Sequence, residues 1–171
     1  MSNVIHPESV QTMEIRKLKE TELSELLALL EAKAEFDGCP ESLRATEENL
    51  RDALFSDRPM AHALVAVING TLVGMATYFS IFSTFIVKPG LWLDDLYVYE
   101  AYRGQGIGKA LMEHLCKIAD ENACGRVDWL VSMHNESGQK FYESIGATIS
   151  DKARLVRLSE LEIKQLAAAD V

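Results

Sequence analysis

Apolar side chains recur every three or four positions early in the chain, which is the spacing of an amphipathic helix. The pattern predicts a helix over 22–36 that stops at Gly38 and Pro40, and a second helix over 47–55 that Thr46 caps. The apolar face of the first helix is expected to comprise Leu23, Leu26, Leu27, Leu30 and Ala34. Later runs predict helices over 109–123, 136–145 and 160–168.

Shorter apolar runs between these helices predict strands. They cover 13–18, 62–68, 71–78, 91–98, 126–132 and 153–158. Asn69-Gly70 is the signal of a two-residue hairpin turn, 83–90 is expected to be a loop, and 91–98 has the apolar content of a central strand buried on both faces. The order of elements predicts one α/β domain over 1–171, built around a mixed sheet.

Three glycines follow the apolar run 91–98 and precede a predicted helix. Gly104, Gly106 and Gly108 allow backbone N–H groups to approach an anion closely, because no Cβ blocks the way. The helix adds unpaired N–H groups and the positive end of its dipole. A helix cap needs one glycine rather than three, so the loop predicts a site for a phosphate-bearing ligand.

The spacing narrows the kind of ligand. G-x-G-x-G does not fit the G-x-G-x-x-G of a dinucleotide-binding loop, and Gly108-Lys109-Ala110 lacks the hydroxyl residue of a P-loop. Arg103, with glycines three and five residues later, resembles instead the Q/R-x-x-G-x-G/A loop of the GCN5-related N-acetyltransferases (GNAT). Members of that family bind the pyrophosphate of acetyl-CoA with this loop.

The resemblance extends from about Ile15 to Leu158 and is closest to the diamine (spermidine/spermine) acetyltransferase branch of the family. The matching segments are Ile15-Arg16, Phe36-Asp37, Leu93 to Val98, Tyr102 to Gly108, Asn135, Phe141 to Glu143 and Gly146-Ala147. The resemblance implies a GNAT fold of class α/β. Its mixed, mostly antiparallel sheet would be flanked by helices and splayed between the fourth and fifth strands, with acetyl-CoA as co-substrate.

The resemblance also implies which residues meet acetyl-CoA. At the splayed strand end, free backbone groups would pair with the pantetheine arm like an added strand, and a loop would hold the pyrophosphate. These residues are Leu96, Tyr97 and Val98 on the strand, and Arg103, Gly104, Gln105, Gly106, Ile107, Gly108 and Lys109 in the loop. Asn135 resembles a family residue near the reactive end of the cofactor, and it could equally be a helix N-cap.

Acetyl transfer needs a proton donor for the leaving thiolate and a group that orients the amine. Tyr142 corresponds to the family's tyrosine donor, and a phenol with an ordinary pKa of about 10 is protonated at neutral pH; the alternative is a core aromatic. Asp94 is an acid in an apolar strand, where an unpaired carboxylate is costly. It corresponds to a substrate-contacting glutamate, and because aspartate is shorter it would act directly or through a water. Asp95 is expected to pair structurally with a cation.

The acceptor pocket is predicted from four residues. Phe36 and Asp37 resemble a Tyr-Glu pair that lines the amine pocket of polyamine acetyltransferases, and an aromatic beside an acid can hold an ammonium group; the alternative is a helix-end contact and a solvated acid. Lys152 and Arg154 bring positive charge where polyamine enzymes carry acids. Unless both simply face solvent, this favours a substrate with one amine and a nearby carboxylate, such as an amino acid or a thioether analogue of lysine.

Composition limits the possible partners and compartment. The 171 residues, 48% of them hydrophobic, suit one globular domain. A net charge of −9 argues against nucleic acid, no apolar run reaches the about 18 residues of a membrane span, and the polar N-terminus does not fit a signal peptide. Cys39, Cys116 and Cys124 are an odd set of thiols that fits a reducing cytoplasm, with Cys116 in the core. The histidines lack ligand spacing, so no metal is expected.

The sequence therefore predicts an N-acetyltransferase that moves an acetyl group from acetyl-CoA to a primary amine of a small molecule, by direct attack in a ternary complex. The alternatives are a non-catalytic acyl-CoA-binding or sensor module of the same fold, and a polyamine-specific acetyltransferase. The resemblance also implies a homodimer. In it, the C-terminal apolar residues would cover a partner or their own sheet; they are Leu158, Leu161, Ile163 and Leu166.

Overall fold

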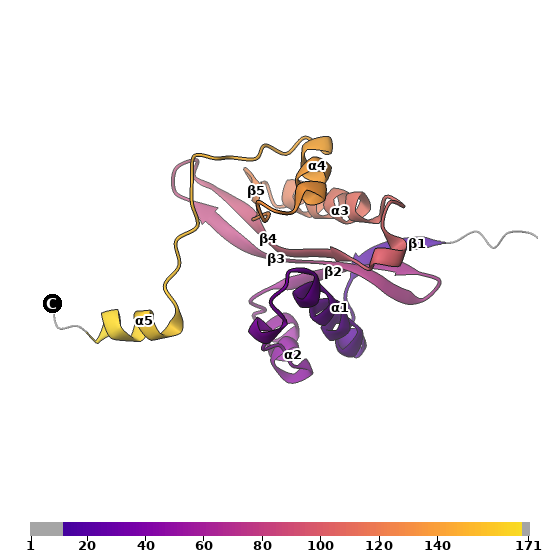
Figure 1. Cartoon of the computed structure of the whole chain (residues 1–171), viewed down its shortest axis with the longest axis horizontal. Helices are drawn as coiled ribbons and strands as arrows, with labels where there is room; N and C mark the ends of the chain where they lie inside the picture. Colours follow the sequence, from indigo (N-terminus) through magenta and orange to yellow (C-terminus); the bar gives the residue numbers. More distant parts are fainter. Residues whose placement is uncertain (1–11, 169–171) are drawn as a thin grey trace, which may run out of the picture. The chain divides into compact units, whose positions relative to one another are not determined.

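The computed structural model describes residues 12–168 of the chain. These residues fall into two compact units, one reaching to Leu130 and the other beginning at Val131. Figure 1 shows the first unit as a twisted sheet with helices on both faces. Each unit is described by itself.

The first unit is built on a five-stranded sheet in the order β1-β2-β3-β4-β5. The first four strands pair antiparallel, and β5 pairs parallel to β4. The strands are β1 (Met13–Lys17), β2 (His62–Ile68), β3 (Thr71–Ser83), β4 (Lys88–Val98) and β5 (Val127–Asp128). The expected mixed, mostly antiparallel sheet is therefore confirmed.

Two helices cover one face of this sheet, and a third covers the other (Figure 1). On the first face lie α1 (Leu23–Phe36) and α2 (Glu47–Phe55), and on the opposite face lies α3 (Ile107–Glu121). Short 3-10 helices η1 (Glu20–Glu22), η2 (Pro40–Ser42) and η3 (Glu100–Tyr102) lie in the connections. Alternate residues of β2 point to the two faces. The cluster under α1 contains Leu18, Leu23, Leu26, Leu29, Ala63, Val65, Val67, Leu72, Met75 and Tyr97.

The second unit contains two helices, α4 (Glu136–Ser144) and α5 (Glu160–Ala167). Gly146, with a φ of 91°, follows the end of α4, as the sequence predicts. At the start of α5, the Glu162 carboxylate accepts a hydrogen bond from the Ser159 N–H at 2.9 Å, so the expected cap is present.

Local signals in the first unit predict its turns and caps correctly. Asn69 and Gly70 have φ values of 50° and 83°, which a two-residue hairpin turn requires. The Asn49 N–H donates to the Thr46 hydroxyl at 3.2 Å, and the Thr46 N–H donates to the Asn49 side chain at 2.8 Å. These signals depend on residues adjacent in sequence, and each lies where it was expected.

Three expectations about strands and loops are wrong. Residues 83–90 are only in part a loop, because β3 continues to Ser83, 84–87 form a turn and β4 begins at Lys88. Cross-strand contacts extend the hairpin, with the Phe79 and Trp92 rings stacked 6.4 Å apart. The strand expected over 126–132 is reduced to the two residues of β5, and that expected over 153–158 is absent. Residues 153–158 are exposed and pair with no strand among the described residues.

Smaller differences concern burial. Leu29 is fully buried, whereas Leu27 and Leu30, expected on the apolar face of α1, are only partly buried. Cys116 is exposed rather than in the core. Asp94 is exposed too, so β4 is not buried on both faces along its whole length. The helix expected over 109–123 begins two residues earlier, at Ile107, because Gly106 takes a left-handed conformation and serves as its N-cap.

Candidate functional site

A β-bulge at Asp94 interrupts the regular pairing of strand β4 with β3. Asp95 pairs with Thr77 on β3 and Leu93 pairs with Tyr78, so Asp94 is an extra residue that forms a β-bulge. On the other side, β5 pairs only with Leu91 and Trp92. Within residues 12–168, the end of β4 therefore lacks a strand partner on its β5 side, and backbone groups of Leu96, Tyr97 and Val98 can meet an extended ligand there.

The glycine-rich loop lies between η3 and α3. Gly104 and Gly106 have φ values of 75° and 81°, and a Cβ placed on either would meet nothing within 4 Å. Backbone bonding in the helix begins where Ala110 N–H donates to Gly106 O at 2.9 Å, so the amides of Ile107, Gly108 and Lys109 form the first turn, where N–H groups lack helical partners. Open space beside these amides, at the positive end of α3, is the geometry of an anion site.

The Lys109 and Gln105 side chains make local contacts around this loop. The Lys109 ammonium lies 3.3 Å from Glu113 in an exposed ion pair. The Gln105 amide donates to the carbonyl of Ala101 at 3.4 Å. Both side chains are anchored near the loop and remain accessible to a ligand.

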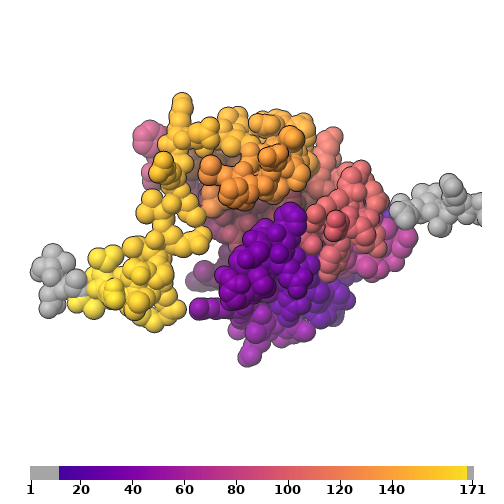
Figure 2. Space-filling view, in the orientation of Figure 1, coloured from indigo at the N-terminus to yellow at the C-terminus, as the bar shows by residue number. Residues whose placement is uncertain are grey.

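Arg103 joins the loop to β4 and to the end of α1. Its Nε donates to the carbonyl of Val98 at 2.9 Å. Its guanidinium carbon lies 4.6 Å from the centre of the Phe36 ring and 5.4 Å from that of Tyr97, and the two rings are 6.1 Å apart. Figure 2 shows the indigo atoms of α1 beside the salmon-coloured segment that follows β4. The structure thus brings together three predicted site residues from separate parts of the sequence: Phe36, Tyr97 and Arg103.

A lysine that the sequence analysis did not single out occupies the acidic part of the site. The ammonium of Lys33 pairs with Asp37 one helical turn later, and it lies 3.1 Å from a carboxylate oxygen of Asp95. The other oxygen of Asp95 accepts from the Thr77 hydroxyl at 3.3 Å. Asp95 therefore has the structural cation that was expected, whereas Asp37 is exposed and also paired with Lys33. The i, i+4 spacing of Lys33 and Asp37 could have indicated this pair.

Charged neighbours shift the pKa values of Lys33 and Asp94. Burial alone would lower the pKa of Lys33, but the hydrogen bond to Asp37 and the charge of Asp95 raise it above its usual value. For Asp94, partial burial of the carboxyl group and the neighbouring Asp95 charge raise the pKa, against the opposing effects of a hydrogen bond from Trp92 and the charge of Lys33. Asp94 as a whole is exposed. The partial burial that raises its pKa therefore comes from protein atoms on one side of its carboxyl group.

The remaining predicted residues belong to the second unit. Asn135 is the N-cap of α4, where its side-chain oxygen accepts from the Gly138 N–H at 2.9 Å and from the Ser137 hydroxyl at 3.1 Å. Tyr142 is partly buried on α4, with its ring 5.2 Å from that of Phe141. Lys152 and Arg154 are exposed and lie outside any helix or strand.

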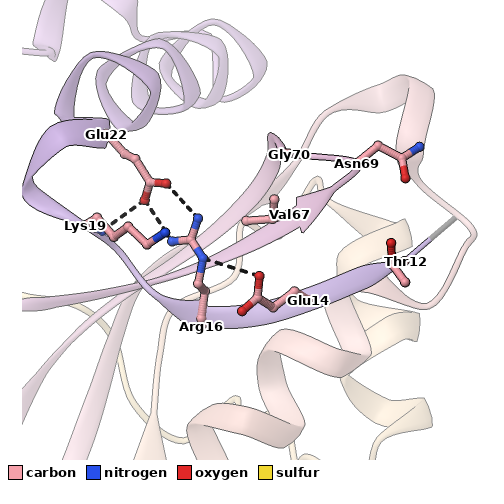
Figure 3. Close-up of a pocket in the computed structure, with 8 residues that line it drawn as sticks. All are labelled: Thr12, Glu14, Arg16, Lys19, Glu22, Val67, Asn69 and Gly70. Atoms are coloured by element: carbon pink, nitrogen blue, oxygen red, sulfur yellow. Dashed lines mark hydrogen bonds and ion pairs between the residues drawn. The ribbon is translucent and has the colours of Figure 1, made fainter.

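A separate surface depression is formed by β1, η1 and the β2–β3 turn (Figure 3). Its lining residues are Thr12, Glu14, Arg16, Lys19, Glu22, Val67, Asn69 and Gly70. Arg16 and Glu22 in this depression pair with each other, since the two terminal nitrogens of Arg16 donate to the Glu22 carboxylate at 2.8 and 2.7 Å. The backbone N–H of Lys19 donates to the same carboxylate at 3.0 Å. The depression shares no residue with the predicted site, and this pairing is structural.

Two further findings concern the described residues. Between residues 12 and 168, no helix has both the length and the apolar character needed to cross a membrane. Over the same residues, histidine, cysteine, aspartate and glutamate side chains form no group of three or more that could hold a metal ion.

Comparisons with known proteins agree with the geometry. A family model described as the Acetyltransferase (GNAT) family matches residues 24–147. The thialysine N-epsilon-acetyltransferase of Sus scrofa is 30% identical over 141 residues, which span 78% of this chain and 82% of that protein. The human spermidine/spermine N(1)-acetyltransferase-like protein 1 is 30% identical over 146 residues, which span 81% of this chain and 21% of that protein.

Solved structures share the fold. An integron cassette protein from the mobile metagenome of V. cholerae superposes with a TM-score of 0.75 at 28% sequence identity, covering 92% of this chain and 98% of the other.

Proposed function

The chain belongs to the acetyltransferase (GNAT) family and is an acetyl-CoA-dependent N-acetyltransferase, and on that premise we propose that it acetylates a primary amine of a small molecule. The observation that carries the proposal is the open glycine loop at the start of α3, next to the end of β4, where residues 12–168 supply no strand partner on the β5 side. Together they offer one site for phosphates and another for an extended chain, and acetyl-CoA has both parts.

The residues present fit this co-substrate. The amides of Gly104 to Lys109 and the dipole of α3 suit the pyrophosphate, and the backbone at Leu96, Tyr97 and Val98 suits the amide groups of the pantetheine arm. Arg103 would hold the loop against β4 through its bond to the Val98 carbonyl. We assign Asn135 to the region near the reactive end of acetyl-CoA, in addition to its place as the N-cap of α4.

We assign the chemical step to direct attack in a ternary complex. The amine nitrogen, as the free base, bonds to the thioester carbonyl carbon, the carbon–sulfur bond breaks, and the nitrogen gives its proton to water. Asp94 orients the amine, directly or through a water, and Tyr142 gives its phenolic proton to the departing thiolate of CoA. Since Asp94 lies in the first unit and Tyr142 in the second, this assignment requires both units to act as one catalytic domain over residues 1–171.

The acceptor we favour is a small zwitterionic amine, in the way that thialysine serves the relatives that are named for it. Phe36 and Asp37 would contact the amine end, and Arg154, with Lys152, would receive a carboxylate. A polyamine acceptor is the second candidate, because one relative is named for spermidine and spermine. Lys33 argues against it, since its pairs with Asp37 and Asp95 leave less negative charge for the additional ammonium groups of a polyamine.

We also propose a cytoplasmic homodimer. The three cysteines are free thiols, which suits a reducing compartment. The C-terminal segment leaves large apolar side chains exposed, which is typical of a surface that another chain covers. They are Leu158, Leu161, Ile163 and Leu166.

The binding site is tested by comparing two glycines of similar geometry. Gly106→Ala should weaken the thermal stabilisation by acetyl-CoA about tenfold in apparent affinity, because the methyl group enters the open space that the phosphates need. Gly70→Ala imposes similar backbone strain, since φ is 83° there against 81° at Gly106, and it should leave the stabilisation unchanged. ATP and NADH should not stabilise the wild-type protein. Absence of stabilisation by any CoA derivative would overturn the proposal.

A further inference from the structure

Lys33 lies between two carboxylates, and a third carboxylate is the chain neighbour of one of them. Its ammonium pairs with Asp37 on its own helix and with Asp95 on β4, at 3.1 Å from Asp95 Oδ1. The Lys33 side chain is 20% exposed and that of Asp95 is 25% exposed, so water screens this pair less than a surface pair. Asp94 immediately precedes Asp95 in the chain and is the bulged residue of β4. One cation therefore pairs with two acids, and a third acid is adjacent to one of them in the chain.

Asp94 is the carboxylate that Lys33 does not bind directly. The neighbouring groups that act on its negative charge are Asp95 on its own strand, which opposes it, and two that favour it: a hydrogen bond from Trp92, also on β4, and Lys33 on α1. From β3, the Thr77 hydroxyl binds Asp95 of this acid pair. On the β5 side, Asp128 is neutralised by Arg126 at 2.8 Å.

We propose that Lys33 is a positioning residue for the acceptor amine: it neutralises Asp37 and Asp95 and thereby leaves Asp94 as the ionised carboxylate that meets the substrate. This inference rests on the proposed function, because it assigns Asp94 to the amine. It adds a role for a residue that would contact neither acetyl-CoA nor the amine.

The physical reason is repulsion between neighbouring carboxylates. Two adjacent ionised acids disfavour each other's charge, and a nearby cation removes part of that cost. Without the Lys33 ammonium, Asp94 would take up a proton at a higher pH, and a neutral carboxyl group attracts a protonated amine less strongly. Lys33 thus connects the last turn of α1 to the charge of a residue on β4.

The test titrates Asp94 in the full chain by carboxyl carbon NMR, with the Asp94 signal assigned from Asp94→Asn. Lys33→Met should move the titration of Asp94 to higher pH, and Lys33→Arg should restore the wild-type position because it keeps the charge. Lys117→Met removes an exposed lysine of α3 and should change nothing. If Lys33→Met fails to fold, Lys33→Gln carries the same expectation, because its amide can still donate to Asp37.

Kinetics provide the second measurement. The ratio of the kcat/KM of Lys33→Met to that of the wild type should fall by up to about tenfold as the pH is lowered through the titration of Asp94, and should approach one as the pH rises, while Lys33→Arg stays near one throughout. An unchanged Asp94 titration, or a loss of activity that is the same at every pH, would overturn the role of Lys33. A wild-type protein that transfers no acetyl group would refute the proposed function, whereas the titration would still decide whether Lys33 controls Asp94.

Discussion

Among single residues, Tyr142 carries the largest part of the proposed chemistry. Tyr142→Phe keeps the ring and removes the proton donor, so kcat should fall by about a hundredfold or more while the affinity for acetyl-CoA stays nearly unchanged. Thiol release at saturating amine measures the first quantity, and thermal stabilisation measures the second. Tyr102→Phe removes a phenol from η3, which has no assigned role, and should remain active. A fully active Tyr142→Phe would show that another donor serves.

The conformation of single residues was predicted correctly from the sequence where a residue type has one main physical use. The paired glycines Gly104 and Gly106 both have positive φ, as a phosphate loop requires. The position of Lys33 in the site was not predicted, because one of its two ion-pair partners, Asp95, is 62 residues away in sequence. Asp95 becomes its neighbour only after α1 packs on β4. The exposed position of Asp94 was missed for the same kind of reason, since the bulge depends on the register between β3 and β4.

Among the elements, η1 is fixed to β1 by the pair of Arg16 and Glu22. The hydrogen bond from Arg16 lowers the pKa of Glu22, despite partial burial, so the ionised form stabilises the fold. This contribution is complete above the ordinary glutamate pKa of about 4.5 and is lost as the pH falls through the lower, folded-state value. Glu22→Gln should therefore destabilise the protein by about 1–2 kcal/mol at pH 7, and by progressively less in acid.

Urea denaturation of the full chain between pH 3 and pH 8 measures this effect. Glu160→Gln is the matched control, because its pair with Lys164 is exposed and should contribute little. A difference between Glu22→Gln and the wild type that does not depend on pH would show that the charge of Glu22 is not what stabilises η1 on β1.

Whole elements were predictable from sequence to the extent that their determinants are local. The capped helix α2, strand β2 and the β2–β3 turn were placed within a residue, because turn and cap residues define their ends, whereas β3 continues past its expected end at Tyr78 to Ser83. The segments 126–132 and 153–158 have strand-like composition, yet a strand exists only where an edge is free to pair with it. Composition cannot report that edge, so β5 was predicted too long and the last strand was wrongly expected.

For the whole molecule, oligomeric state follows from the C-terminal unit. Its exposed leucines and isoleucine suggest a covered surface, so light scattering at micromolar concentration should give about twice the 19.0 kDa of one chain. Leu161→Glu together with Leu166→Glu, on α5, should shift the protein toward monomers by placing charge in that contact. A wild-type monomer would exclude the homodimer.

The net charge of −9 also affects which acceptors the whole molecule attracts. An acidic protein attracts cations in general, and this would favour polyamines over zwitterions at low ionic strength. Selectivity must therefore come from the site, where Lys33 reduces the local negative charge and Arg154 could supply a contact for a carboxylate. The preference for a zwitterion should persist at high salt if it has this local origin.

The central claim, acetyl transfer to a small primary amine, is tested most directly by acetyl-CoA-dependent thiol release with a panel of amines at one concentration. Thialysine, lysine, several amino acids, putrescine and spermidine belong in that panel. The account predicts release that requires both acetyl-CoA and an amine, with thialysine or another zwitterionic amine preferred over spermidine by about ten- to a hundredfold in kcat/KM. Spermidine as the best substrate would contradict the assignment of the acceptor. No release with any amine, by a protein that binds acetyl-CoA, would contradict the catalytic claim itself.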